Sequence, residues 1–183
     1  MTMKGAMPDS LATPARPGVG SHLERLVAAF DALDASSTHD SLPQFLHTGA
    51  TLLCTVLDGD CAAFSRLDGN RLVDVVMFNP RGHLTADEIA LVGDYPATRT
   101  VLATRVPAMA HVDDPTSDGA EVGLLQEFGL SSVLLLPIVC GPYTWGLAEA
   151  YRERPEALGG DDVSVARLFA AHLGSLLLRF YEL

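Results

Sequence analysis

The sequence has few basic residues and almost no lysine. Its 183 residues include 12 Lys+Arg against 23 Asp+Glu, which gives a formal net charge of -11, and Lys4 is the only lysine. Proteins that bind the phosphate backbone of nucleic acids need a basic face, so this composition argues against a nucleic-acid partner. A catalytic Schiff-base lysine or a P-loop lysine is nearly excluded as well.

Cysteines and long apolar runs are also scarce. Cys54, Cys61 and Cys140 are an odd number and form no CxxC pair, which is typical of free, buried thiols in a reducing cytoplasm. No apolar run reaches the ~20 residues that span a bilayer. The N-terminus lacks the charged-then-apolar layout of a signal peptide. We therefore expect a cytoplasmic, globular protein without a membrane partner.

The hydrophobic content is high enough for a folded core. Hydrophobic residues make up 48% and charged residues 19% of the chain, unlike a disordered acidic protein. Residues 1–20 contain several prolines and glycines without periodicity, and they predict a flexible N-terminal segment. Residues 21–183 then predict a single domain, since no internal repeat or second domain is visible.

Turn residues and periodicity predict the elements of that domain. Asp68-Gly69-Asn70 and Gly141-Pro142 each separate two runs of β-forming residues, so we expect two β-hairpins. Pro137 cannot donate to a ladder and should lie at a bulge or an unpaired point. Gly129 is a typical residue after a helix end. Helices are predicted over residues 21–35, 41–56, 85–92, 95–102, 119–128 and 160–183, and a short edge strand over 106–112.

This order predicts an α+β fold with an antiparallel sheet. The segments Tyr95–Leu102, Asp113–Pro115, Glu121–Leu130, Ser132–Ile138 and Gly146–Glu149 follow one another in a pattern that resembles the GAF domain of bacterial sensor proteins. The resemblance runs from about Leu23 to the C-terminus. It implies a central antiparallel sheet of five to six strands, with the terminal helices on one face. Short helices and loops would cover a pocket on the other face.

The resemblance implies a ligand pocket, which matches a mixture of apolar and polar side chains in the sequence. Apolar walls with a few polar anchors are what a small-molecule site requires. Arg99 would grip a carboxylate or phosphate, unless it pairs with Glu149 and only holds a helix on the sheet. The expected ligand-binding residues are Phe78, Tyr95, Arg99, Phe128, Trp145 and Glu149.

Members of this family also include cofactor-binding and redox-active proteins. Free methionine sulfoxide reductases of the family use cysteines, but the Tyr95–Leu102 segment contains none. Haem would need an axial ligand such as His111 or His83. His111 with Asp113, Asp114 and Asp118 has metal-ligating residue types at a spacing that matches no known loop. We therefore expect no enzyme activity, no cofactor and no metal, and keep haem-binding or redox function as the third hypothesis.

The terminal helices suggest self-association. Leu176, Leu177 and Leu178 follow one another, which is more apolar surface than one sheet face covers. GAF domains commonly dimerise through such helices, so we expect a homodimer through residues 22–35 and 163–181. The favoured function is a sensory or regulatory module that binds a small metabolite or nucleotide-like ligand and acts through dimerisation or a separate signalling protein. The alternative is a structural dimerisation or protein-interaction domain with a closed pocket.

Overall fold

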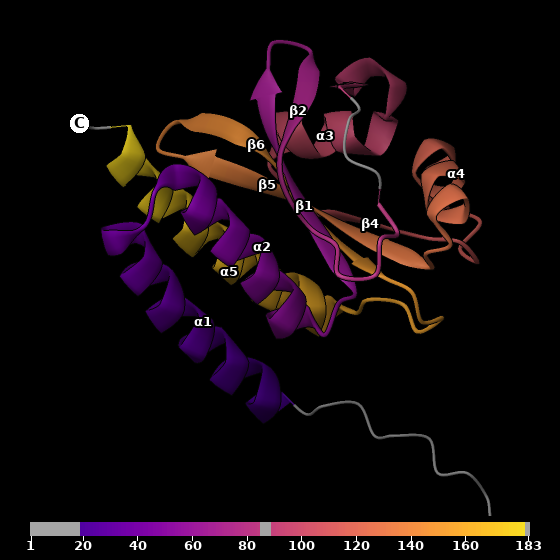
Figure 1. Cartoon of the computed structure of the whole chain (residues 1–183). Helices are drawn as coiled ribbons and strands as arrows, with labels where there is room; N and C mark the ends of the chain where they lie inside the picture. The colour runs from indigo at the N-terminus through magenta and orange to yellow at the C-terminus, as the bar shows by residue number, and fades with distance from the viewer. Residues whose placement is uncertain (1–18, 85–88, 182–183) are drawn as a thin grey trace, which may run out of the picture.

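The computed structural model describes residues 19–84 and 89–181 of the chain. Within these residues, helices surround one sheet (Figure 1). The elements in chain order are α1 (Val19–His39), α2 (Leu42–Leu57), β1 (Cys61–Asp68), β2 (Arg71–Phe78), β3 (Ala90–Leu91), the 3-10 turn η1 (Val92–Asp94), α3 (Pro96–Thr104), β4 (Ala108–His111), α4 (Gly119–Phe128), β5 (Ser132–Cys140), β6 (Tyr143–Arg152), α5 (Gly160–Leu177) and the 3-10 turn η2 (Leu178–Phe180).

The sheet has six strands in the order β3-β2-β1-β6-β5-β4, and every neighbouring pair is antiparallel. The predicted α+β class and antiparallel sheet are thus confirmed. Both predicted hairpins, β1-β2 and β5-β6, are present. The two hairpins meet along β1 and β6, which form the middle of the sheet.

Two apolar clusters cover the two faces of the sheet. On one face, α2 and α5 contact the strands, and α1 lies against both helices rather than against the sheet (Figure 1). On the other face, α3 and α4 cover a smaller cluster that includes Leu125, Leu135 and Leu147. We call these the helix-bundle face and the short-helix face. Terminal helices on one face and short helices on the other agree with the expected layering.

Local sequence explains where several elements end. Gly69 in the first hairpin turn and Gly129 after α4 have φ angles of 63° and 67°, a region that glycine occupies without steric cost. Asp118 caps α4, since its carboxylate accepts hydrogen bonds from the backbone N–H groups of Ala120 and Glu121. The predicted end of α4 at Gly129 is confirmed.

Other sequence expectations need correction. The predicted helix over 85–92 is absent from its described part, because Ala90–Leu91 pairs with β2 and a 3-10 turn follows. Residues 85–88 lie outside the described residues. The first helix begins at Val19, before its predicted start at residue 21. The flexible segment predicted for residues 1–20 lies almost wholly outside the described residues.

The C-terminal helix is buried more deeply than its sequence suggested. Gly160–Phe180 is long and apolar enough to cross a membrane by composition, with a mean hydropathy of 1.3. The core helix of a globular protein passes the same test, and α5 packs along β5. Leu177 is fully buried and Leu176 nearly so. The expectation that Leu176 and Leu177 form an exposed strip is therefore wrong, because both belong to the apolar cluster of the helix-bundle face.

Candidate ligand site on the short-helix face

Glu149 lies near the middle of the short-helix face. It is on β6, opposite Ala63 of β1 and Leu135 of β5, and both of these neighbours are buried and apolar. Glu149 keeps part of its surface accessible. Its side chain thus lies between two buried apolar neighbours on the short-helix face.

The surroundings of Glu149 favour its protonated form. Burial, followed by the negative charges of Glu121 and Asp74, raises the pKa of Glu149 from 4.5 to about 8. A hydrogen bond with the Tyr151 side chain opposes this rise. Burial likewise raises the pKa of Tyr151 well above its usual value. Near neutral pH, Glu149 therefore has the capacity to donate a hydrogen bond as well as to accept one.

A second carboxyl group reaches the same face from α4. Glu121 is almost fully buried, and the Thr98 hydroxyl of α3 donates a 2.8 Å hydrogen bond to its carboxylate. Burial raises the pKa of Glu121, although the bond from Thr98 lowers it. This bond ties α3 to α4. Thr98, Glu121, Glu149 and Tyr151, which we call the Glu149 cluster, come from α3, α4 and β6.

Two of the six predicted ligand-binding residues are on the opposite face. Phe78 packs against the helix-bundle cluster, and its ring lies 6.5 Å from that of His47 on α2. Trp145 is buried in the same cluster, where its indole N–H donates a 2.9 Å hydrogen bond to the Tyr181 hydroxyl. The expectation that Phe78 and Trp145 line a pocket beneath the short helices is therefore wrong.

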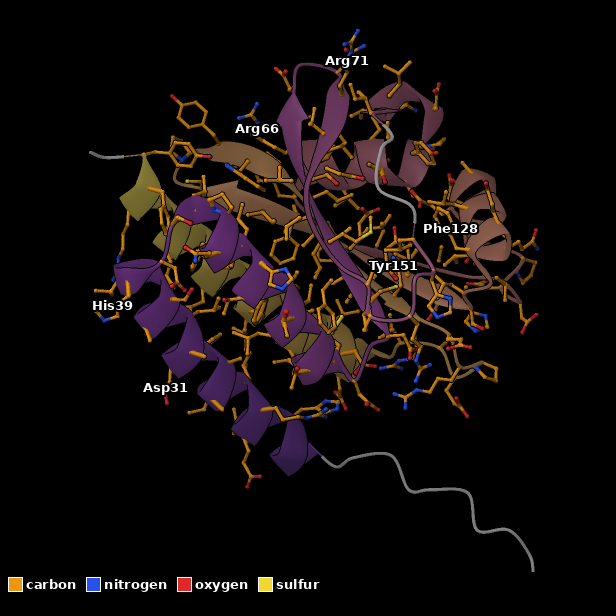
Figure 2. All side chains as sticks on the ribbon, viewed as in Figure 1. Asp31, His39, Arg66, Arg71, Phe128 and Tyr151 are labelled. Carbon is orange, nitrogen blue, oxygen red and sulfur yellow. The ribbon has the colours of Figure 1, made fainter. Side chains whose placement is uncertain are left out.

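The other four predicted residues divide between the site and its surroundings. Glu149 is central, and Phe128 packs against the short-helix cluster at the end of α4. Phe128 and Tyr151 are both on the side of the sheet nearer α4 (Figure 2). Tyr95 is partly buried directly before α3, whereas Arg99 is exposed and forms no ion pair with Glu149 among the described residues. Thr98, its neighbour, points inward instead.

Sequence reasoning missed three members of the Glu149 cluster. Thr98 and Glu121 are polar residues on short helices, and their inward position depends on how these helices pack against the sheet. Tyr151 was predictable, because it follows Glu149 by two residues on one strand and must therefore face the same side.

The three cysteines lie in the interior of the protein. Cys54, Cys61 and Cys140 are all buried. Burial raises the pKa values of Cys54 and Cys61 to about 12, which disfavours the nucleophilic thiolate. This environment opposes a role like that of the methionine sulfoxide reductases.

The residues once considered for metal or haem have other partners. A hollow of about 200 Å³ is bordered by His111, Asp113 and Asp114. The His111 Nε2 atom lies 2.9 Å from the Pro155 carbonyl oxygen, and Nδ1 accepts from the backbone N–H of Asp113. Asp114 accepts two hydrogen bonds from Thr116. In residues 19–84 and 89–181, no group of three or more His, Cys, Asp or Glu is placed to hold a metal ion.

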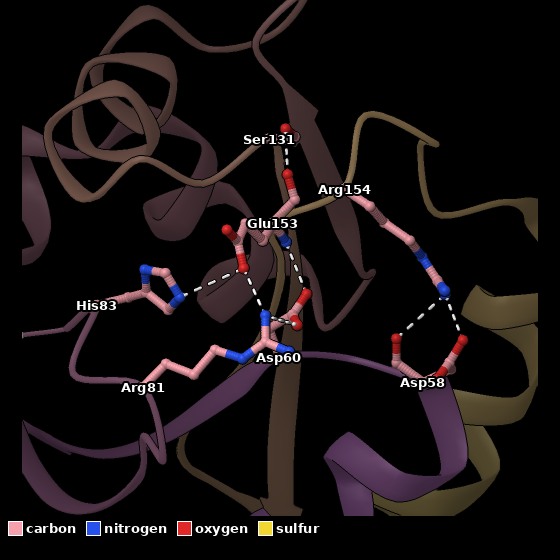
Figure 3. A network of polar contacts seen from close by, with 7 residues as sticks. All are labelled: Asp58, Asp60, Arg81, His83, Ser131, Glu153 and Arg154. Carbon is pink, nitrogen blue, oxygen red and sulfur yellow. Dashed lines mark hydrogen bonds and ion pairs between the residues drawn. The ribbon is translucent and has the colours of Figure 1, made fainter.

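A polar network fastens the connection after β2 to the ends of β1 and β6 (Figure 3). Arg81 pairs with Glu153 at 2.6 Å and with Asp60 at 3.3 Å, and His83 lies 3.5 Å from Glu153. Asp60 also accepts a hydrogen bond from the backbone N–H of Glu153. The segment that carries Arg81 and His83 is thereby held beside the sheet.

The architecture resembles solved phytochrome structures. The chromophore-binding domain of an unusual bacteriophytochrome from R. palustris aligns with a TM-score of 0.74 and 12% identity, over 89% of this chain and 63% of that one. The phycoerythrobilin-bound GAF domain from a cyanobacterial phytochrome aligns with a TM-score of 0.74 and 13% identity, over 87% and 97%. The phycocyanobilin-bound GAF domain from a cyanobacterial phytochrome aligns with a TM-score of 0.69 and 16% identity, over 91% of this chain and 97% of that one. At these identities the likeness shows the fold alone.

Sequence comparison gives a family but no individual relative. The family model described as GAF domain matches residues 41–177, which is most of the chain. No curated protein matches the sequence. The match begins before α2 and extends to the end of α5, so it includes both hairpins and the short-helix face.

Proposed function

Because this chain belongs to the GAF domain family, we propose that it is a non-catalytic sensory or regulatory module that binds a small ligand on the short-helix face. The observation that carries the proposal is the carboxyl group of Glu149, a partly accessible residue that lies between the buried apolar residues Ala63 and Leu135. A buried carboxyl group that serves only the core is costly, whereas a ligand-binding group repays that cost when the ligand is bound.

The ligand would be a small molecule with polar groups that match the Glu149 cluster. Glu149 and Glu121 offer oxygen atoms, and Leu125, Leu135 and Leu147 supply the apolar surroundings. No arginine forms an ion pair with either glutamate among the described residues, so an anionic head group has no counter-charge at this point. We therefore favour a neutral or cationic ligand with hydrogen-bond donors over the carboxylate or phosphate expected from Arg99.

Native mass spectrometry of the purified full chain tests this proposal. The expected result is a small additional mass on the wild type that is lost from Glu149→Leu. Glu127→Leu is the matched control, because Glu127 is exposed on α4, and this variant should keep the additional mass. Two results together would contradict ligand binding: the wild type carries no additional mass, and no compound of a metabolite panel raises its melting temperature.

We propose in addition that the module is a cytoplasmic homodimer through its terminal helices. Leu23 and Val27 on α1 and Leu168 on α5 are 58%, 52% and 57% exposed. Near their C-terminal ends, α1 and α5 run parallel, since Asp34 lies 3.4 Å from His172 and Ser37 accepts from Arg179. Equal steps back along both helices from these two contacts bring Val27 level with residues 165 to 169 of α5, a range that contains Leu168. This apolar strip supports the second candidate function, a structural dimerisation domain.

A further inference from the structure

A groove lies on the helix-bundle face at the outer edge of β5, on the opposite side of the sheet from the Glu149 cluster. Strand β4 pairs with β5 only from Ser132 to Leu135, so this edge of β5 has no strand partner from Leu136 onward. The space that is left has a volume of about 190 Å³. It is bordered by α5 on one side and by the connection between α3 and β4 on the other.

Two arginines border this groove from different elements. Arg105 comes from the connection after α3, and Arg167 comes from α5. No aspartate or glutamate is among the bordering residues, although the whole chain has a net charge of -11. Among residues 19–84 and 89–181, neither arginine forms an ion pair. The groove is therefore a local concentration of positive charge on an acidic protein.

Arg105 is held in place before any ligand binds. Its Nη2 atom donates a 2.6 Å hydrogen bond to the Pro142 carbonyl oxygen, and Nε donates a 3.2 Å bond to the Thr144 hydroxyl. The guanidinium group carries five N–H donors, so these two bonds leave donors for an anion. A group that is already positioned loses less conformational entropy when it binds.

The floor of the groove is apolar. Leu136 and Val139 of β5 and Ala170 and Ala171 of α5 border it, and none of them presents a polar side chain. The volume of about 190 Å³ leaves room for a small molecule, since it is several times the space that one bound water needs. A bare inorganic ion would gain nothing from this apolar surface.

We propose that this groove binds a small organic anion, whose carboxylate or phosphate lies between Arg105 and Arg167 and whose apolar part contacts the accessible surfaces of Val139 and Ala171. Guanidinium groups match the planar, paired oxygens of both head groups. The groove is independent of the site proposed on the short-helix face, because the sheet separates the two. A module with both sites would respond to two chemically different ligands.

Isothermal titration calorimetry on the full chain at low salt tests this inference, with phenyl phosphate, benzoate and inorganic phosphate as probes. One of the two aromatic anions should bind about tenfold more tightly than inorganic phosphate, because only they fill the apolar floor. Comparison of phenyl phosphate with benzoate identifies the head group. Equal affinity for all three anions, or no binding of any, would overturn the proposal.

Variants assign the binding to the groove. Arg167→Gln should lower the affinity for the aromatic anion by about tenfold. Since Arg167 is exposed, the substitution should not disturb folding. Arg105→Gln should lower the affinity to a similar extent. A melting curve of this variant shows whether loss of the hydrogen bonds to Pro142 and Thr144 has destabilised the fold. Arg71→Gln is the matched control, because Arg71 points away from the first hairpin (Figure 2). An equal loss in Arg71→Gln would show attraction by overall charge and overturn the assignment.

Discussion

Glu149 shows how the position of one residue gives it unusual chemistry. Its backbone is part of an ordinary ladder between β1 and β5, but the pleat directs the side chain toward α3 and α4. There it meets Glu121 and Asp74 rather than a basic partner, so the charged form is disfavoured. Folding therefore binds a proton at this residue at pH values where the unfolded chain has none.

This proton uptake makes stability depend on pH. The pKa of Glu149 is higher in the folded state, at about 8, than in the unfolded state, so its contribution favours folding at low pH and is lost as the pH rises toward 8. We expect Glu149→Gln to remove this loss, because glutamine stays neutral throughout. Urea unfolding of both proteins between about pH 5 and pH 9 measures the difference.

At the alkaline end of that range, Glu149→Gln should be more stable than the wild type. Glu127→Gln is again the matched control, since Glu127 is exposed. If the difference in free energy of unfolding between the wild type and Glu149→Gln is the same at every pH, the carboxyl group of Glu149 is already ionised at pH 5 and the prediction is wrong.

At the scale of strands and helices, much of the fold could be predicted from the sequence. Asp68-Gly69 and Gly141-Pro142 located both hairpins, and Gly129 located the end of α4, because each of these turns needs a particular backbone conformation. Pro137 was expected at a bulge or an unpaired point. The bulge lies one residue later, between Ile138 and Val139, and β4 leaves the Pro137 edge unpaired.

The facing of side chains was harder to predict, and two bulges explain why. In β2, Val76 and Asp74 oppose consecutive residues of β1, so Val75 is the extra residue. As a result Leu72 and Phe78 face opposite sides although they are an even number of residues apart.

The second bulge misled the prediction in the same way. In β6, Gly146 and Thr144 oppose consecutive residues of β5, so Trp145 is the extra residue. Trp145 and Glu149 therefore face opposite sides although they are four positions, an even number, apart. Turn chemistry reveals hairpins, but nothing in the sequence marks Val75 or Trp145 as the extra residue of a bulge.

The contact between α5 and β5 depends on the absence of a side chain. A Cβ atom at Gly174 would overlap the backbone carbonyl of Val139, so Gly174→Ala should force the helix and strand apart. We expect a loss of about 2 kcal/mol or more in the free energy of unfolding. Gly123→Ala on α4 is the control, since nothing lies near its added Cβ, and it should be about 0.5–1 kcal/mol more stable. Equal effects of the two substitutions would contradict the close approach.

At the scale of the whole molecule, Arg152 connects three elements. It is buried at the end of β6, donates a 2.6 Å hydrogen bond to the Leu57 carbonyl of α2, and lies 3.9 Å from Asp162 of α5. Arg152→Met should lower the free energy of unfolding by about 3 kcal/mol, because it leaves a buried carboxylate without its counter-charge.

The neighbouring arginine provides the comparison. Arg154 pairs with Asp58 at 2.6 Å, but both side chains are about half exposed. Arg154→Met should therefore cost less than about 1 kcal/mol. Thermal or urea unfolding measures the stability of the two variants. A similar loss in free energy of unfolding for both would show that burial does not set the strength of the ion pair at Arg152.

The proposed dimer is also a property of the whole molecule. Val27→Glu and Leu168→Glu should each convert the dimer to a monomer at micromolar concentration, because a buried, unpaired charge opposes association. Sedimentation velocity measures the mass. Ile89→Glu, at an exposed position outside the terminal helices, should remain dimeric. A wild type that sediments as a monomer would refute the interface.

The bulge at Trp145 has a practical consequence. The chain has one tryptophan, and its indole is hydrogen-bonded to Tyr181, just beyond η2. Intrinsic fluorescence excited at the indole band therefore reports on the docking of the C-terminal turn. Glu149 lies on the other side of the sheet from Trp145. A change in emission when a compound binds at the short-helix face would therefore show that binding there alters the structure of the opposite face.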